Sequence, residues 1–220
     1  MPSVKIPRKS TDFDMTPFVD VAFLILTFFM LATKFKTQDP VEITTPNSVS
    51  SDILPENDAL LVTIDKDNRV FFSAFSGKDP TKLDDIINSI NTSKGLNLTS
   101  AEIQNFRKTV AVGVPFSQLK SLLGVPADQQ ASLKQVGIPL DTTGGELTYW
   151  IQAAKSAFAG RRLTYLIKGD GKSKYPAFDG VLTALKKNDQ FKFNLVTSPE
   201  DAPSGTELYN SRHGSGAKAK

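Results

Sequence analysis

The chain has 220 residues, of which 40% are apolar and 22% are charged, a composition typical of a globular protein with one or two domains. It contains no cysteine, which excludes disulfides and cysteine-ligated metal sites. The net charge of +3 arises at the two ends, because residues 37–206 hold 18 Lys and Arg against 19 Asp and Glu, a net charge of −1. This distribution argues against a nucleic-acid-binding domain, which carries positive charge on its folded part.

The segment FVDVAFLILTFFMLAT, residues 18–33, is apolar enough to enter a membrane. Thr16 and Pro17 form a helix start before it, with Thr at the N-cap and Pro at the first helical position. We therefore predict one transmembrane helix over residues 17–35. It is slightly short for a hydrocarbon core of about 30 Å, and flanking lysines extend it by reaching the far interface.

Two other interpretations of this segment remain. A secretory signal peptide also has a basic start and an apolar core, but MLATKFK lacks the A-x-A pattern of a cleavage site. The other interpretation is a helix buried in a soluble protein. For an anchored chain, the slight excess of Lys and Arg at the N-terminus predicts that residues 1–16 lie in the cytoplasm. Residues 36–220 would then lie on the opposite side of the membrane.

Asp20 lies within the apolar segment, where an unpaired carboxylate is costly. Helical spacing places Leu24, Thr27 and Leu31 on the same face, so the two polar side chains line up along one side of the helix. This pattern predicts a face that meets other membrane helices or a water-filled path. The alternative is a hydrated Asp20 at the headgroup level, where its charge stabilises the helix N-terminus.

Residues 36–58 are rich in Pro, Ser, Asn and Asp and are predicted as a linker, in which residues 41–45 are suited to pair as a short strand. Beyond the linker, strand-like and helix-like patterns follow one another. We predict an α+β domain over 59–200, with a small mixed sheet and two helices on one face, and a disordered tail over 201–220. Its elements are strands at Leu60–Ile64 and Arg69–Phe75, a helix at 81–90, a strand at Leu163–Lys168, a helix at Pro176–Lys187 and a strand at Lys192–Thr197.

A long insert, about residues 92–160, separates the first of these helices from the next strand. Because it holds four stretches with helical apolar spacing, we predict a small helical subdomain packed on the sheet. Trp150, the single tryptophan, is predicted to belong to a core rather than to a binding site. The helical stretches are residues 100–108, 116–123, 127–136 and 145–158.

No pattern in the sequence predicts an enzyme, a cofactor or a metal site. GDGK at 169–172 lacks the glycine spacing of a phosphate-binding loop and the Ser or Thr that follows its Lys. The acidic DKD at 65–67 is predicted as a hairpin turn. The single histidine, His213, lies in the tail, where it has no partners for nucleophilic catalysis.

The stretch DMTPFVDVAFLILTFFMLAT, residues 14–33, resembles the N-terminal signature of the ExbD/TolR family of biopolymer-transport proteins. The match includes Thr16, Pro17, Asp20 and the Phe-Met pair near the helix end. LLVTIDKDNRVFF, LIKGDGKSKYPAFDGVLTALKKN and LVTSPE resemble the first hairpin, the strand–turn–helix and the closing strand of the family's periplasmic domain. The insert at 92–160 departs from that pattern, because the compact family domain has only a short connection there.

The resemblance implies a single-pass subunit of the bacterial inner membrane, with its N-terminus in the cytoplasm and its C-terminal domain in the periplasm. Two such helices would sit inside a ring of an ExbB- or TolQ-like partner, and the subunit would pair with a second copy of itself. Asp20 matches the family's proton-responsive carboxylate, with Thr16, Pro17 and Thr27 supporting the helix start or the proton path. The motor would use the proton motive force to energise TonB-dependent import through a TonB-like protein.

Two alternatives remain at this stage. A TolR-type subunit of a Tol-Pal envelope-integrity motor, whose outer domain engages peptidoglycan, would share the same features. A membrane-anchored periplasmic binding module with no motor belongs to a different class. Asp20 argues against this second alternative, because a passive anchor gains nothing from a carboxylate in its apolar segment.

Overall fold

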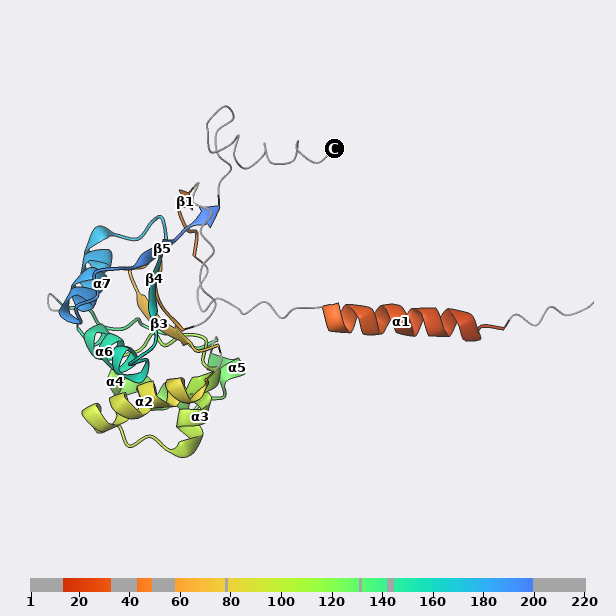
Figure 1. Ribbon diagram of the computed structural model, residues 1–220, viewed down its shortest axis with the longest axis horizontal. Coiled ribbons are helices and arrows are strands. Elements are labelled where there is room, and N and C mark those ends of the chain that lie inside the picture. Colours follow the sequence, from red (N-terminus) through yellow and green to blue (C-terminus); the bar gives the residue numbers. More distant parts are fainter. Residues whose placement is uncertain are drawn as a thin grey trace, which may run out of the picture. The chain divides into compact units, whose positions relative to one another are not determined.

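The computed structural model of the protein divides the chain into two compact units, residues 1–38 and 39–220, which we describe separately (Figure 1). The structure describes residues 14–32, 43–48 and 58–199, except for 78, 131 and 142–144. The predicted tail and its His213 therefore lie outside the described residues, as do the first 13 residues and most of the predicted linker.

The first unit holds helix α1, Thr16–Ala32, which has 17 residues. The Asp14 carboxylate caps this helix, because its Oδ1 accepts hydrogen bonds from the Thr16 backbone N–H, at 3.0 Å, and from the Thr16 hydroxyl. Thr16 is thus the first helical residue rather than the N-cap that we predicted. In the described part of the chain, no helix is both long and apolar enough to cross a membrane. The last predicted membrane residues, 33–35, lie outside the described residues.

The second unit is built on a four-stranded mixed sheet, as predicted. The order is β3-β2-β4-β5, in which β2 pairs antiparallel with β3 and parallel with β4, and β4 pairs parallel with β5. Alternate residues of β2, namely Leu60, Val62 and Ile64, point into the core. The strands are β2 (Ala59–Ile64), β3 (Val70–Phe75), β4 (Thr164–Gly169) and β5 (Asn194–Val196), beside a separate parallel pair of β1 (Asn47–Ser48) and β6 (Ser198–Pro199).

Helices from both the predicted domain and its insert cover this sheet (Figure 1). Helix α6 contacts β3 and α7 contacts β2, whereas α2 packs against α6. The helical layer on the sheet therefore also contains α6, which belongs to the insert. The helices are α2 (Thr81–Lys94), α3 (Ser100–Lys108), α4 (Phe116–Leu123), α5 (Ala127–Gln130), α6 (Leu147–Ala157) and α7 (Tyr175–Lys187).

Trp150 shows that the insert and the sheet share one core. Its ring lies 4.9 Å from the ring of Phe72 in β3, 5.9 Å from that of Phe106 in α3 and 5.7 Å from that of Phe116 in α4, measured between centroids. Trp150 is fully buried, which agrees with its predicted core role. The insert therefore packs on the sheet, and its helices share the central core of the unit.

The predicted helix over 127–136 was wrong beyond Gln130, where α5 ends. The following chain runs alongside the sheet instead: the Gly137 N–H donates to the Gly113 carbonyl at 2.7 Å, and the Ile138 N–H donates to the Val70 carbonyl at 2.8 Å. Gly137 has φ +93°, a conformation that favours glycine and is incompatible with helix. Pairing with β3 thus overrides the local helical spacing.

The short strand predicted within the linker lies further along the chain. Residues 43–46 are not in a strand, and pairing begins at Asn47–Ser48, which is β1. Residues 41 and 42 lie outside the described residues. A strand needs a partner, and the Ser198 N–H donates to the Pro46 carbonyl at 3.0 Å, so β6 determines where β1 begins.

Candidate functional site

The polar face of α1 holds the first candidate site. Asp20, Leu24 and Thr27 are spaced so that they share one side of the helix, and the Asp20 side chain is exposed. The Thr27 hydroxyl lies 2.9 Å from the carbonyls of both Phe23 and Leu24, to which it donates. Since a hydroxyl has one hydrogen, Thr27 is left as a hydrogen-bond acceptor toward groups outside the helix.

Asp14 is a second carboxylate at the same end of α1, and the sequence reasoning missed its role. The hydrogen bonds from Thr16 lower the pKa of Asp14 below its ordinary value, because they stabilise the charged form. The signal was an Asp two residues before the Thr-Pro pair, a spacing at which a carboxylate accepts a hydrogen bond from the backbone N–H two residues further along the chain. The Asp14 carboxylate caps the N-terminus of α1, whereas Asp20 lies within the helix.

In the second unit, Asp170 joins two distant stretches of chain. It follows β4 and is only 6% exposed. Its Oδ1 accepts a hydrogen bond from the Lys172 N–H at 2.8 Å, and its Oδ2 accepts one from the Thr44 N–H at 2.9 Å. These two N–H groups lower the pKa of Asp170, the Lys172 bond being the larger cause.

Residues 43–48, which we name the strap, are held against the second unit at two further places. The Gly171 N–H donates to the Thr44 carbonyl at 2.9 Å, which completes a pair of contacts with the turn after β4. At the other end the strap pairs with β6, and the hydroxyls of Thr45 and Ser198 are hydrogen-bonded to each other. The strap and Asp58 are the described parts of the predicted linker.

A groove of about 320 Å³ lies beside the strap. Pro46 of the strap, Asp170 and the turn after Asp170 form part of its wall, and residues of β4, α7 and β5 supply most of the rest. Tyr175 and Leu195 line the groove and are 69% and 54% exposed, so apolar surface is open to solvent here.

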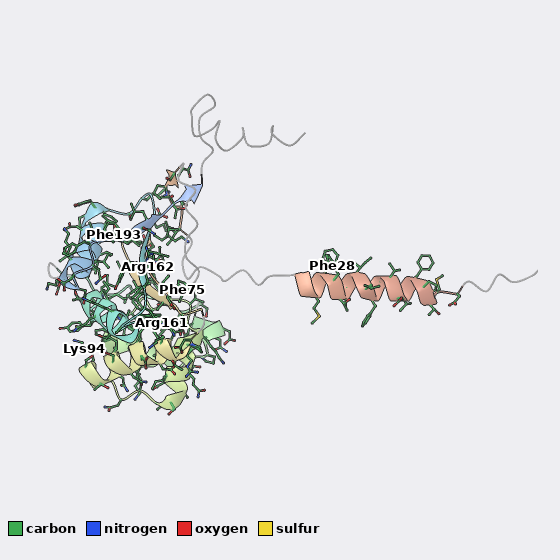
Figure 2. All side chains as sticks on the ribbon, viewed as in Figure 1. Phe28, Phe75, Lys94, Arg161, Arg162 and Phe193 are labelled. Carbon is green, nitrogen blue, oxygen red and sulfur yellow. The ribbon has the colours of Figure 1, made fainter. Side chains whose placement is uncertain are left out.

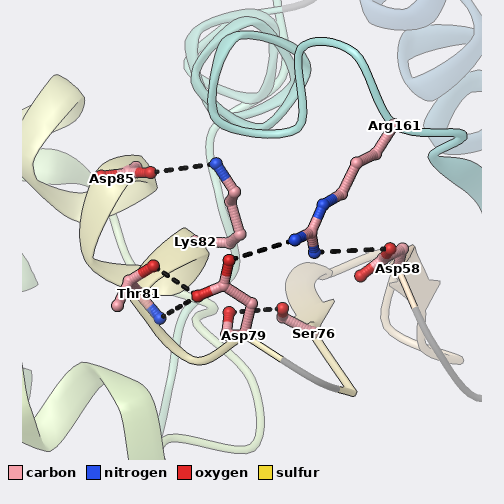
Figure 3. Close-up of polar contacts among 7 residues, drawn as sticks. All are labelled: Asp58, Ser76, Asp79, Thr81, Lys82, Asp85 and Arg161. Carbon is pink, nitrogen blue, oxygen red and sulfur yellow. Dashed lines mark hydrogen bonds and ion pairs between the residues drawn. The ribbon is translucent and has the colours of Figure 1, made fainter.

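Arg161 forms a third cluster at the point where β2 begins (Figures 2 and 3). Its guanidinium lies 3.2 Å from the Asp79 carboxylate and 3.9 Å from that of Asp58. Asp79 in turn accepts a hydrogen bond from the Thr81 hydroxyl at the start of α2, which lowers the pKa of Asp79. The cluster joins Asp58, at the end of the predicted linker, to the loop before α2 and the loop before β4.

The polar clusters do not form a metal centre. Among the residues that the structure describes, no group of three or more His, Asp or Glu side chains is placed to hold a metal ion. Of the residues predicted as functional, Thr16, Pro17, Asp20 and Thr27 all lie on α1. The contacts of Asp14, Asp170 and the strap were not predicted.

The described chain thus holds an apolar helix that bears a carboxylate and a separate α+β unit. Comparison with protein families identifies the class of protein: the chain matches the family described as biopolymer transport protein ExbD/TolR over residues 7–200. The chain belongs to this family. Its members are transport-associated, generally membrane-anchored and generally work with ExbB- or TolQ-type partners. Searches of curated proteins and of solved structures gave no match.

Proposed function

We propose that the protein is the energy-transduction subunit of an inner-membrane motor of the ExbB–ExbD type, which uses the proton motive force to energise TonB-dependent import across the outer membrane. The observation that carries the proposal is Asp20, a carboxylate within the apolar helix of a member of the ExbD/TolR family. A carboxylate in such a segment is a functional group by default, because it is costly to keep there.

The proposal assigns the membrane to residues 17–35, with residues 1–16 in the cytoplasm and the second unit in the periplasm. The apolar run supports this assignment, since α1 carries no Lys, Arg or Glu and Asp20 is its single charged residue. N-terminal sequencing of the membrane-bound protein tests it. An intact N-terminus is expected, and a mature chain that begins near Thr33 contradicts both the anchor and the motor.

In the proposed mechanism, Asp20 takes up a proton from one side of the membrane and releases it to the other. The free lone pairs of Thr27, two turns along the same face, accept a hydrogen bond from water or from the ring protein and so assist the path. The charged form and the neutral form of the Asp20 side chain favour different positions of the helix pair within the ring. The second unit, present as a pair of copies, passes this motion to a TonB-like protein.

The test is the change Asp20→Asn, scored by growth that depends on energised outer-membrane uptake. Asn has nearly the same shape but carries no charge, so it separates protonation from packing. We expect uptake to be lost while the amount of protein in the membrane stays normal. Normal uptake by Asp20→Asn at normal abundance would contradict the motor and return Asp20 to a role at the helix N-terminus.

Asp14→Asn is the matched control, because it removes a carboxylate six residues away on the same helix end. Asn caps helices about as well as Asp, so uptake should be retained. The ring protein that co-purifies with the wild-type chain distinguishes the ExbD-type motor from the TolR-type motor of envelope integrity. An ExbB-like partner is expected, and a TolQ-like partner would assign the TolR type and its engagement of peptidoglycan.

A further inference from the structure

The groove beside the strap brings the core of the second unit into contact with solvent. Ile167 of β4 is fully buried and belongs to the core, Phe178 of α7 packs against that core, and both side chains line the groove. Tyr175 and Leu195 line it as well and remain largely exposed. A ligand that covers such apolar surface gains free energy by removing it from water.

The size and lining of the groove fit a small apolar molecule. Its volume of about 320 Å³ lies at the lower end of the range of about 300–1,000 Å³ that is usual for small-molecule sites. The strand beside it, β5, has only three residues and offers few main-chain hydrogen bonds to an added peptide strand. An apolar chain needs no such bonds. Most side chains in the wall are apolar, namely Pro46, Ile167, Tyr175, Phe178, Leu195 and Val196.

The polar side chains of the wall leave one charge without a partner, that of Lys174. Asp170 also lines the groove, but its two carboxylate oxygens accept the N–H groups of Lys172 and Thr44. The Ser173 hydroxyl donates to the Asp170 carbonyl at 2.7 Å. Among the residues that the structure describes, no carboxylate forms an ion pair with the Lys174 ammonium. This ammonium is therefore free to pair with an anionic group of a ligand.

The surroundings of Asp170 add further positive charge. The pKa of Asp170 is lowered mainly by its two N–H partners and, beyond these, by the positive charges of Lys172 and Lys66. Both charges therefore act close to the groove wall. The carboxylates of the hairpin turn at 65–67 are ion-paired with Arg69. The groove thus combines apolar walls with an excess of positive charge, which favours an anionic group.

We propose that the groove binds a fatty acid, a single apolar chain that ends in a carboxylate. The chain covers Tyr175 and Leu195, and the carboxylate pairs with the Lys174 ammonium. This site lies within the second unit and does not involve Asp20. The inference therefore goes beyond the proposed motor and does not depend on it.

A fatty acid with a diazirine in its chain tests the site in the full-length protein held in lipid nanodiscs. Irradiation should attach this probe to residues 175–182 or 194–197, and mass spectrometry of the peptides locates the attachment. Excess decanoate should prevent the labelling, because the two compete for one groove. The same probe with a hydroxyl in place of the carboxylate should label the groove about tenfold less, since its neutral head forms no ion pair.

Two variants with matched controls identify the side chains that bind the probe. Lys174→Gln removes the charge and keeps the 2.6 Å hydrogen bond from the backbone N–H of this residue to Asn68. Leu195→Asn removes exposed apolar surface from the wall. Each should lower labelling of the groove about tenfold. Lys192→Gln and Phe191→Asn change exposed side chains that do not line the groove, and they should label as the wild type does.

Equal labelling by the acid and by the alcohol would overturn the proposal, as would labelling that decanoate does not displace. Labelling elsewhere in the chain but not in the groove would have the same consequence and would leave a peptide as the occupant. Unchanged labelling of Lys174→Gln would overturn the ion pair. Asp20→Asn should label as the wild type does, so failure of this site and failure of the motor are distinguishable.

Discussion

At the scale of single residues, Trp150 combines large apolar contact with one unmet polar group. Its indole stacks on rings from β3 and α3 and lies tilted against a ring from α4, yet its buried N–H has no hydrogen-bond acceptor in the described structure. An unpaired buried donor costs free energy, so the contribution of this residue comes entirely from its ring.

Truncation of the Trp150 ring should lower the free energy of unfolding strongly, and replacement by a smaller ring should lower it only slightly. Trp150→Ala is expected to lower the free energy of unfolding by about 3–5 kcal/mol, because a cavity is left among three aromatic rings. Trp150→Phe should cost less than half as much, since it removes the unpaired N–H together with part of the ring. Urea unfolding of both variants, followed by circular dichroism, measures the difference. Equal losses would mean that the N–H is satisfied in solution.

Asp170 makes a prediction about pH. Its pKa is lowered below the ordinary value of 3.8 by N–H groups of Lys172 and of Thr44, with smaller contributions from the positive charges of Lys172 and Lys66. A group whose pKa is lowered in the folded structure stabilises that structure above its ordinary pKa, and the stabilisation is lost as the pH falls through the lowered value. The contact between Asp170 and the strap therefore does not respond to mild acidity.

The measurement is hydrogen exchange of the Thr44 amide across pH, corrected for the intrinsic rate. Protection should stay constant between about pH 7 and about pH 5, and it should fall only below 3.8. A loss of protection near neutral pH would contradict this and would point to a group other than Asp170.

At the scale of elements, local patterns were predictable and long-range pairings were not. The strands β2 and β3 and the helix α7 follow from alternation and helical spacing within a few residues, and the structure places them within one or two residues of the prediction. The strap depends on Asp170, which is 126 residues away from Thr44 in the sequence. The chain after α5 likewise depends on the free edge of β3. No local pattern carries such information, so both segments were misassigned.

The segment after α5 covers one edge of the four-stranded sheet. Residues around Val112 and Ile138 bond to the outer edge of β3, through the Phe72–Val112 bridge and the Ile138 N–H to Val70 carbonyl bond. An edge that is covered in this way cannot template another strand. Among the described residues, the insert thus leaves β5 as the uncovered edge of the four-stranded sheet.

Gly137 tests this arrangement. It has φ +93°, and a Cβ added there would lie 3.0 Å from the Arg69 Cα and 3.1 Å from the Val70 nitrogen. Gly137→Ala should therefore destabilise the fold by about 1–3 kcal/mol, because the strained backbone sits against β3. Gly169→Ala is the control: its Cβ would meet nothing closer than the Ser173 hydroxyl at 3.8 Å, and the change should be near neutral. Thermal melts of the two variants make the comparison, and a similar loss in both would mean that the edge contact is unimportant.

At the scale of the whole molecule, the second unit should unfold as one body. Its core contains side chains from the sheet, from α2 and α7, and from the insert helices α3, α4 and α6. A subdomain merely packed on a sheet would have its own core and its own transition. A shared core instead couples the insert to the sheet, so loss of either exposes the other.

A fragment of residues 37–220 is therefore expected to be soluble and to show a single cooperative transition on heating. Near-ultraviolet circular dichroism reports Trp150, which lies in the insert, and far-ultraviolet circular dichroism reports the helices and strands throughout the unit. Both signals should give the same midpoint, because the indole cannot leave its three ring partners without opening the contact between α6 and the sheet. A Trp150 transition that precedes the loss of secondary structure would show that the insert melts by itself. Aggregation or a non-cooperative melt would show that the unit needs its anchor, or the ring protein, to hold its fold.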